Sequence, residues 1–454
     1  MKAAFIEKQR ALFSWAAAAL DKPLPEQVRR RAATILADDI GAMVAGSLEP
    51  QVKAARDGFL KRATAEKSAT VFAAGAPRVD RDTAACANGM AITWCELDEG
   101  FRNASCHAGA YTLPALLAEC ERLGKTTDQV LRTLAVAYEV TTRFALAFPF
   151  PTFTVHPHAA WATIGAATGI SLARGYDAST MASAVTGAAT MTFAGPFDTA
   201  VEGSLVRNGW TAAGAWIGLR AADWAEAGIG GGAGTIYDVF ARSFKCDVKP
   251  EALLDGLGER WSVANGYHKI FACCQYAHTA VEATLDLLRR KGERRLDELA
   301  EIVVETSPGG MALTTVEPET VLAAKFSIPH AVAATTSLGT AGAKAFTYDT
   351  LRDDEIAELR RKVKLAPYPN LQPAPKDRPA RITWLFSDGA KLVATSESAR
   401  GGADQPFDEA TLLAKLADNA GGVFPRLPAA LARVIDGERS AVGMSWKSFL
   451  ESAL

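Results

Sequence analysis

Hydrophobic residues recur every three or four positions through most of the first 266 residues, as they do along one face of an amphipathic helix. Such runs cover residues 25–43, 127–147 and 159–174, and the last two end near Gly or Pro, where helices commonly stop. These segments are also rich in Ala and Gly. Because small side chains let helix backbones approach closely, we predict a tightly packed all-helical domain.

The pattern changes after Ala283. Residues 299–306 and 380–386 are rich in β-branched and aromatic side chains that alternate with polar ones, which predicts strands. Residues 387–390 contain Asp-Gly and predict a hairpin turn into a further strand at 391–395. Charged stretches with helical spacing lie between these strands.

Residues 407–454 return to helical spacing, so we expect this last segment to dock on the first domain. The predicted fold class is therefore mainly α with a second α+β domain. Residues 1–266 and 401–454 would form the large helical domain, and residues 267–400 a smaller α+β lid domain.

Two segments resemble known sequence signals, a signal peptide and a phosphate-binding loop, but each lacks a feature that the signal requires. Residues 1–20 are interrupted by Glu7, Lys8 and Arg10, which indicates an amphipathic helix rather than a signal peptide. The glycine-rich run 228–234 follows a helical stretch and lacks the Lys-Ser/Thr of a phosphate loop, so we interpret it as a flexible connector. No segment has the roughly 18 uninterrupted apolar residues of a membrane-spanning helix. We expect a cytoplasmic protein that binds no membrane.

Composition narrows the class of protein. The chain is 49% hydrophobic and 22% charged, as globular enzymes are. Its 49 Lys and Arg residues balance 51 Asp and Glu residues, so no excess charge attracts nucleic acid or anionic lipid, and anions must be bound by a local pocket. Seven cysteines at irregular spacing do not form a disulfide framework, and they indicate a reducing compartment.

Candidate chemistry is concentrated in a few polar segments. The chain has six histidines, and each lies beside turn residues or other polar groups, as the residues of a shared site would. One segment, Glu96–His107, carries three carboxylates, an Arg and a His directly before an apolar helix expected from about Leu113. A polar loop that caps this helix, with Pro114 in its first turn, would give the same pattern. The residues alone leave both interpretations open.

This segment resembles the signature of the MmgE/PrpD superfamily, in which an acidic run is followed by a His and then by an apolar helix. Here the acidic run is Glu96–Gly100 and the His is His107. The resemblance continues, in the order of the superfamily, at four further blocks, which are Val155–His158, Glu202–Gly209, Tyr267–His278 and Ala324–His330. Together the five blocks span most of the chain.

Members of this superfamily include 2-methylcitrate dehydratase, cis-aconitate decarboxylase and iminodisuccinate epimerase. The resemblance implies a large helical domain with an α+β lid, an active site between the two, and a homodimer. It also implies a small polycarboxylate substrate and no metal or organic cofactor. The pairs His156-x-His158 and Cys273-Cys274 agree, because neither has the spacing of a common zinc site.

Removing a proton next to a carboxylate requires a base in reach, and cations for the charge that develops on the carboxylate. The resemblance implies that Arg207, where relatives usually carry Lys, and Lys269 bind substrate carboxylates. It also implies that His107 and His156 act as base, acid or substrate ligand. We expect all four side chains to meet in one cleft, although surface cations and buried structural histidines would give the same sequence.

The other polar residues of these blocks have two interpretations each. Glu96 and Asp98 would orient His107 or Arg102, or lie on a solvated loop. His268 is interpreted as structural. Further candidates for substrate contact, each with a structural role as the alternative, are Arg102, His158, Cys273, His278 and His330.

Two positions depart from the relatives and bear on the reaction. Aligning Lys269 with the family Lys puts Cys274 where dehydratase-like and decarboxylase-like members have a His, and His330 where decarboxylase-like members have a Tyr. The usual donors for dehydration are therefore altered. Cofactor-independent epimerases often use thiols, and nearby cations would favour the thiolate of Cys274 or Cys273. The alternative for each cysteine is a small buried hydrophobe.

We therefore hypothesise an isomerase that epimerises a small polycarboxylate such as iminodisuccinate, by removing and returning the proton α to a carboxylate. The alternative is a hydro-lyase resembling 2-methylcitrate dehydratase. A third hypothesis, a non-catalytic binding member, is disfavoured because Arg207, Lys269, His107 and His156 are all present.

Overall fold

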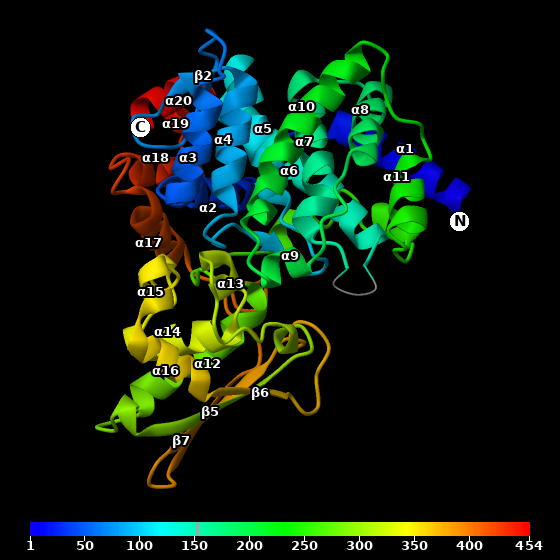
Figure 1. The fold of residues 1–454 in the computed structure, drawn as a ribbon. Coiled ribbons are helices and arrows are strands. Elements are labelled where there is room, and N and C mark those ends of the chain that lie inside the picture. The colour runs from blue at the N-terminus through cyan, green and yellow to red at the C-terminus, as the bar shows by residue number, and fades with distance from the viewer. Residues whose placement is uncertain (151–153) are drawn as a thin grey trace.

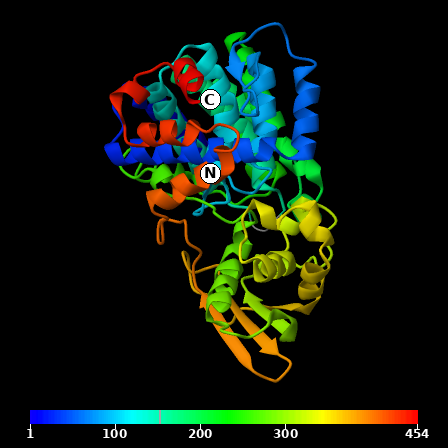
Figure 2. The same ribbon diagram turned by 90° about the vertical axis from the view of Figure 1, so that its left-hand side faces the viewer.

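The chain forms a large helical part and a smaller α+β part, which lies below the helices in Figure 1 and again in the perpendicular view of Figure 2. The computed structural model describes residues 1–150 and 154–454. The predicted fold class, mainly α with a second α+β domain, is confirmed. No helix of the described chain is both long and apolar enough to cross a membrane.

Amphipathic and Ala-rich segments form the helices of the helical part, as their spacing predicts. The first of these helices are α1 (Lys2–Ala19), α2 (Glu26–Ser47), α3 (Pro50–Leu60), α4 (Arg81–Ile92), α5 (Ala108–Arg122) and α6 (Thr127–Ala147). They are followed by α7 (Pro157–Arg174), α8 (Ala178–Thr190), α9 (Asp198–Val201), α10 (Gly209–Glu226) and α11 (Thr235–Tyr237). Two short antiparallel pairs interrupt them, β1 (Ala69–Thr70) with β2 (Arg78–Val79), and β3 (Gly100–Phe101) with β4 (Gly266–Tyr267).

Helix α7 lies at the centre of the helical part, in contact with α5, α6, α8 and α10. Every residue of α7 except Arg174 is buried. The approach of α10 depends on small residues, because a Cβ on Gly218 would lie 2.4 Å from the Cβ of Ala166. The Ala and Gly content of these helices therefore does produce the close packing that the sequence predicts.

Two local predictions need correction. Helix α5 begins at Ala108, directly after His107, so Pro114 lies inside the helix and not in its first turn. Residues 108–121 are all buried, and their packing outweighs the hydrogen bond that a proline removes from a helix interior. The glycine-rich run 228–234 does connect two helices, but its backbone packs tightly on α8, where a Cβ on Gly231 would lie 2.3 Å from the carbonyl carbon of Thr186.

The α+β part is built on a mixed four-stranded sheet with strand order β6-β5-β7-β8. Strand β5 (Leu299–Thr306) pairs in parallel with β6 (Val363–Pro367) and antiparallel with β7 (Ala380–Phe386), which forms the predicted hairpin with β8 (Lys391–Ser396). Alternate residues of β7 are buried, as its sequence pattern predicts. The helices of this part are α12 (His278–Arg290), α13 (Val321–Lys325), α14 (Ile328–Leu338), α15 (Tyr348–Arg352) and α16 (Asp354–Lys362).

The end of the chain returns to the helical part. Its helices are α17 (Glu409–Ala420), α18 (Leu427–Ile435), α19 (Arg439–Val442) and α20 (Trp446–Ala453), of which α17 and α18 pack on α2 (Figure 2). The ammonium of Lys415 donates to Asp38 of α2 at 2.5 Å. One hydrophobic cluster joins the two parts, because Trp94, Leu97 and Phe197 pack with residues of the sheet and its helices. Residues 96–98 therefore have a fixed position at the junction.

Candidate active site

A charged cavity of about 60 Å³ lies where the helical part meets the α+β part. Its walls come from the segment between α4 and α5, from the start of α7, and from residues that follow β4. The sequence candidates that line it are Glu96, His107, His156, Arg207, Lys269 and Cys274.

Arg207 and Lys269 meet at one carboxylate. The Oε1 atom of Glu96 is 2.6 Å from Nη2 of Arg207, and its Oε2 atom is 3.3 Å from Nζ of Lys269. Lys269 also lies 3.4 Å from Oδ1 of Asp98. All four residues are at most 2% exposed. Two buried cations thus face two buried carboxylates, and neither carboxylate lies on a solvated loop.

The pairing keeps Lys269, Glu96 and Asp98 charged despite their burial. Burial disfavours the ammonium of Lys269, but Asp98 and Glu96 outweigh it and hold the pKa of Lys269 above its usual range. Burial also opposes both carboxylates, yet Arg207 and Lys269 keep the pKa of Glu96 below its usual range. Lys269 and His107 do the same for the pKa of Asp98. The cavity is therefore a preorganised ionic site.

His107 is held so that one ring nitrogen is free. Its Nδ1 atom is 2.7 Å from Oδ2 of Asp98 and 2.7 Å from the carbonyl oxygen of Glu99. Both neighbours are acceptors, so Nδ1 carries the hydrogen of the neutral ring and Nε2 carries the lone pair. Among the described residues, none hydrogen-bonds to Nε2, and the side chain remains 13% exposed. This is the arrangement of a general base that a carboxylate orients.

A second carboxyl pair lies behind His107. Glu99 accepts from the backbone N–H of Gly109 and from the Tyr138 hydroxyl, while Asp39 accepts from the backbone N–H of Glu99 at 2.9 Å. Burial raises the pKa of Glu99 to about 8, although its two donors oppose this rise. Burial, and then the charge of Glu99, raise the pKa of Asp39 well above its usual range. Glu99 is therefore protonated near neutral pH, and the two carboxyls brace the backbone that contacts His107.

His156 and His158 lie at the start of α7, and their positions differ from that of His107. Nε2 of His156 is 3.3 Å from Nε of Arg207, and its Nδ1 faces the backbone N–H of His158 at 3.1 Å. A neutral ring has only one acceptor nitrogen, so these two donors already compete for it. Burial and Arg207 hold the pKa of His156 well below its usual range. His156 is therefore a poorer base than His107, and it lies in position to hold Arg207.

His158 does not line the cavity but lies against both other histidines. Its ring centroid is 4.9 Å from that of His107 and 4.6 Å from that of His156, and its Nδ1 is 2.9 Å from the Tyr111 hydroxyl. Burial, and then Arg207, keep its pKa well below the usual range. His158 packs behind the site and fixes the orientation of its neighbours.

Of the two cysteines, only Cys274 lines the cavity, while Cys273 is fully buried. The expectation that nearby cations would produce a thiolate is wrong. Burial, and then the charge of Glu96, raise the pKa of Cys274 to about 11 against the weaker effect of Lys269. Cys274 is therefore a neutral thiol at physiological pH, and it can donate a proton but not accept one.

The other candidates lie outside the cavity. His278 faces the carbonyl of Cys273 at 3.1 Å, and burial lowers its pKa to about 3. His330 is buried between the Ala345 carbonyl and Arg360, and His268 pairs with Asp38 at 2.7 Å. The guanidinium of Arg102 contacts Ser398, Asp377 and the Pro375 carbonyl, so Glu96 and Asp98 do not orient it.

Several lining residues were not singled out from the sequence. Arg378, on the loop before β7, reaches the amide of Gln275 and lies 4.4 Å from the Tyr276 ring centre. Phe326 lies 5.3 Å beneath the Arg207 guanidinium. Gln275, Tyr276 and Phe326 belong to blocks already recognised, whereas Arg378 lies in a Pro-rich loop that carries no periodic signal.

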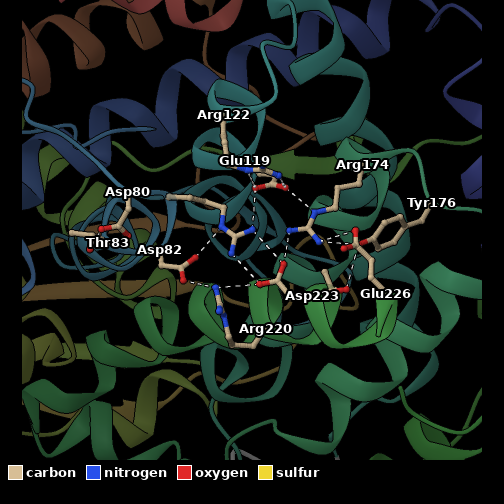
Figure 3. Close-up of polar contacts among 12 residues, drawn as sticks. Asp80, Asp82, Thr83, Glu119, Arg122, Arg174, Tyr176, Arg220, Asp223 and Glu226 are labelled. Carbon is tan, nitrogen blue, oxygen red and sulfur yellow. Dashed lines mark hydrogen bonds and ion pairs between the residues drawn. The ribbon is translucent and has the colours of Figure 1, made fainter. Parts of the chain in front are cut away.

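A second polar cavity, of about 680 Å³, lies on the helical part, and Figure 3 shows its ion pairs. Arginines and carboxylates of α4, α5, α7 and α10 alternate there. Glu119 contacts Arg174 and Arg122 at 2.7 Å each, and Asp223 contacts Arg174 at 2.7 Å and Arg81 at 3.0 Å. Each of these arginines has a carboxylate partner, so the network joins the four helices.

No group of three or more His, Cys, Asp or Glu side chains in residues 1–150 and 154–454 is arranged to hold a metal ion.

Two family models match the sequence. The model described as the MmgE/PrpD N-terminal domain matches residues 10–245, which is more than half of the 454 residues. The model described as the MmgE/PrpD C-terminal domain matches residues 271–437. A comparison with curated proteins gives no match. The two matched segments include all the ionic and histidine residues named above as lining the cavity except Lys269, which lies between the segments.

Proposed function

Because the chain belongs to the MmgE/PrpD family, whose members include dehydratases and epimerases, we propose that it is an isomerase that epimerises a small polycarboxylate by moving the proton α to a carboxylate. The single observation that carries this proposal is the Asp98–His107 pair. Because Nδ1 of His107 contacts Asp98, Nε2 of the same ring is available as a base in a cavity that two cations line.

The cations would stabilise the charge that forms when the proton leaves. An α-proton is acidic enough to remove only when the electron pair is delocalised onto the adjacent carboxylate, which then carries additional negative charge. Lys269 and Arg207 line the cavity and are held in place by Glu96. As the proton moves to Nε2, His107 becomes a cation beside Asp98, so the new positive and negative charges both have partners.

Cys274 supports epimerisation as a proton donor. In this step the thiol gives its proton to the α-carbon from the face opposite to His107, the C–H bond re-forms, and a thiolate remains. His107 has gained one proton and Cys274 has lost one, so a net transfer through solvent resets the site. The neutral state of the thiol, whose pKa burial raises to about 11, is the state that this role requires.

The same thiol gives a reason to keep the hydro-lyase as a second candidate. After the α-proton has left, a neutral thiol can protonate a departing β-hydroxyl as well as a carbon. The substrate, and not the acid, would then decide between the two outcomes.

Proton NMR in D2O separates these candidates. Wild-type protein is incubated with single stereoisomers of dicarboxylates and tricarboxylates, with and without a β-hydroxyl. Deuterium at the α-carbon with inversion and an intact skeleton supports the isomerase. Loss of water with a new alkene signal supports the hydro-lyase instead. If no compound of the panel shows exchange or dehydration, both the isomerase and the hydro-lyase are contradicted. The remaining hypothesis is then a non-catalytic member of the family that only binds its ligand.

A further inference from the structure

A larger, mainly apolar cavity adjoins the charged one. It measures about 430 Å³, which is within the usual range for small-molecule pockets. The two cavities share five lining residues, Ala104, Ser105, Pro157, Phe197 and Tyr276. A molecule bound at Lys269 therefore lies beside this space.

The wall of the larger cavity is apolar and aromatic. Phe148, Phe150 and Trp161 line it, with Leu146 and Ala252 between them. The Trp161 ring stacks on Phe240 with centroids 4.3 Å apart, and Phe150 lies 6.0 Å from Trp161. Trp161 is only 1% exposed, so this wall is held in place by packing. Lys249, which also lines this cavity, is an exposed residue.

The sizes of the two cavities point to one arrangement of the ligand. The charged cavity, at about 60 Å³, has room for a reacting carboxylate and little more, whereas the apolar cavity would accept a chain of several carbons. We propose that the substrate carries an apolar alkyl or aryl arm on its carboxylate-bearing skeleton, and that this arm binds between Leu146, Trp161 and Ala252. This inference rests on the proposed function, because it places the carboxylate at Lys269.

Isothermal titration with succinate and its 2-methyl, 2-propyl and 2-hexyl derivatives tests the inference. Burial of one methylene strengthens binding by about threefold to fourfold, so the affinity of wild type is expected to rise at about that rate with each added carbon. The variant Ala252→Trp fills the cavity, and Leu146→Glu places a charge in it. Both are expected to remove this dependence on chain length while the affinity for succinate itself is retained.

Leu413→Glu is the matched control, because Leu413 is a half-buried helical leucine of α17 that lines neither cavity. It should keep the full dependence on chain length. Wild-type affinities that do not change with the arm, absence of binding for the whole series, or an unchanged dependence in both cavity variants would each overturn the inference. Deuterium exchange on the same compounds is measured separately. Binding that depends on the arm without exchange would contradict the proposed function and leave the apolar site intact.

Discussion

Replacing Asp98 by Asn tests whether the carboxylate sets the state of His107. Asp98 lies 2.7 Å from Nδ1, so its loss removes the charge that orients the ring and stabilises the imidazolium formed on proton transfer. The same substitution in a Ser-His-Asp triad lowers kcat about 10⁴-fold. Here the Glu99 carbonyl is a second acceptor at 2.7 Å and still favours the correct tautomer. We therefore expect a smaller loss in kcat, on the order of 10² to 10³, from the charge alone.

The chain contains a matched control for this variant. Asp38 makes an equivalent pair with His268 at 2.7 Å and contacts Lys415 at 2.5 Å, as Asp98 contacts His107 and Lys269. Both aspartates are buried, but His107, the partner of Asp98, lines the cavity, whereas His268, the partner of Asp38, does not. Initial rates of α-proton exchange are measured for both variants well below their melting temperatures. Asp38→Asn should lose stability and keep kcat. If Asp98→Asn keeps wild-type kcat, or if Asp38→Asn loses as much, the assignment of His107 as the base is wrong.

Three further predictions concern the thiol, the buried carboxyl and the ion-pair network. Cys274→Ser should sharply lower epimerisation while proton exchange from one stereoisomer survives, whereas Cys273→Ser should retain both activities. If both variants keep full activity in the NMR assay, the two cysteines serve only as packing residues. Glu99 has a raised pKa, so the folded state binds more protons than the unfolded state between about pH 4.5 and 8, and stability falls as the pH rises through this window. Glu99→Gln should therefore flatten the melting temperature between pH 6 and 8.5, and an unchanged slope would show that Glu99 is ionised. Glu119→Gln removes a buried partner of three arginines and should cost about 2–4 kcal/mol in urea unfolding with kcat unchanged, while a loss below about 0.5 kcal/mol would mean that the network contributes little.

Much of the fold could be predicted because periodicity in this chain is strong. Helix α6 has the predicted bounds, Thr127–Ala147, and strands β5 and β7 likewise coincide with the predicted segments 299–306 and 380–386. The start of α5 could not be predicted in this way. Its position depends on packing between α5 and α7, which local rules for Pro114 do not include.

The site was predictable only in part, for a similar reason. The blocks that carry Glu96, His107, Arg207 and Lys269 stand out in the sequence, and their side chains meet in the structure. The ionisation of Cys274 does not follow from its neighbours' types, because burial and the position of Glu96 outweigh Lys269. No single sequence motif predicts the apolar cavity, because residues of α6, of α7 and of the segment 249–252 form it together.

The most direct test of the central claim is a crystal structure with a slow or unreactive dicarboxylate bound. The account predicts its α-carbon within about 3.5 Å of Nε2 of His107, the distance at which a reacting pair is aligned. A carboxylate of the ligand should contact Lys269, and Cys274 should lie on the opposite face of the α-carbon. A ligand that binds with Nε2 of His107 turned away from its α-carbon would contradict the account.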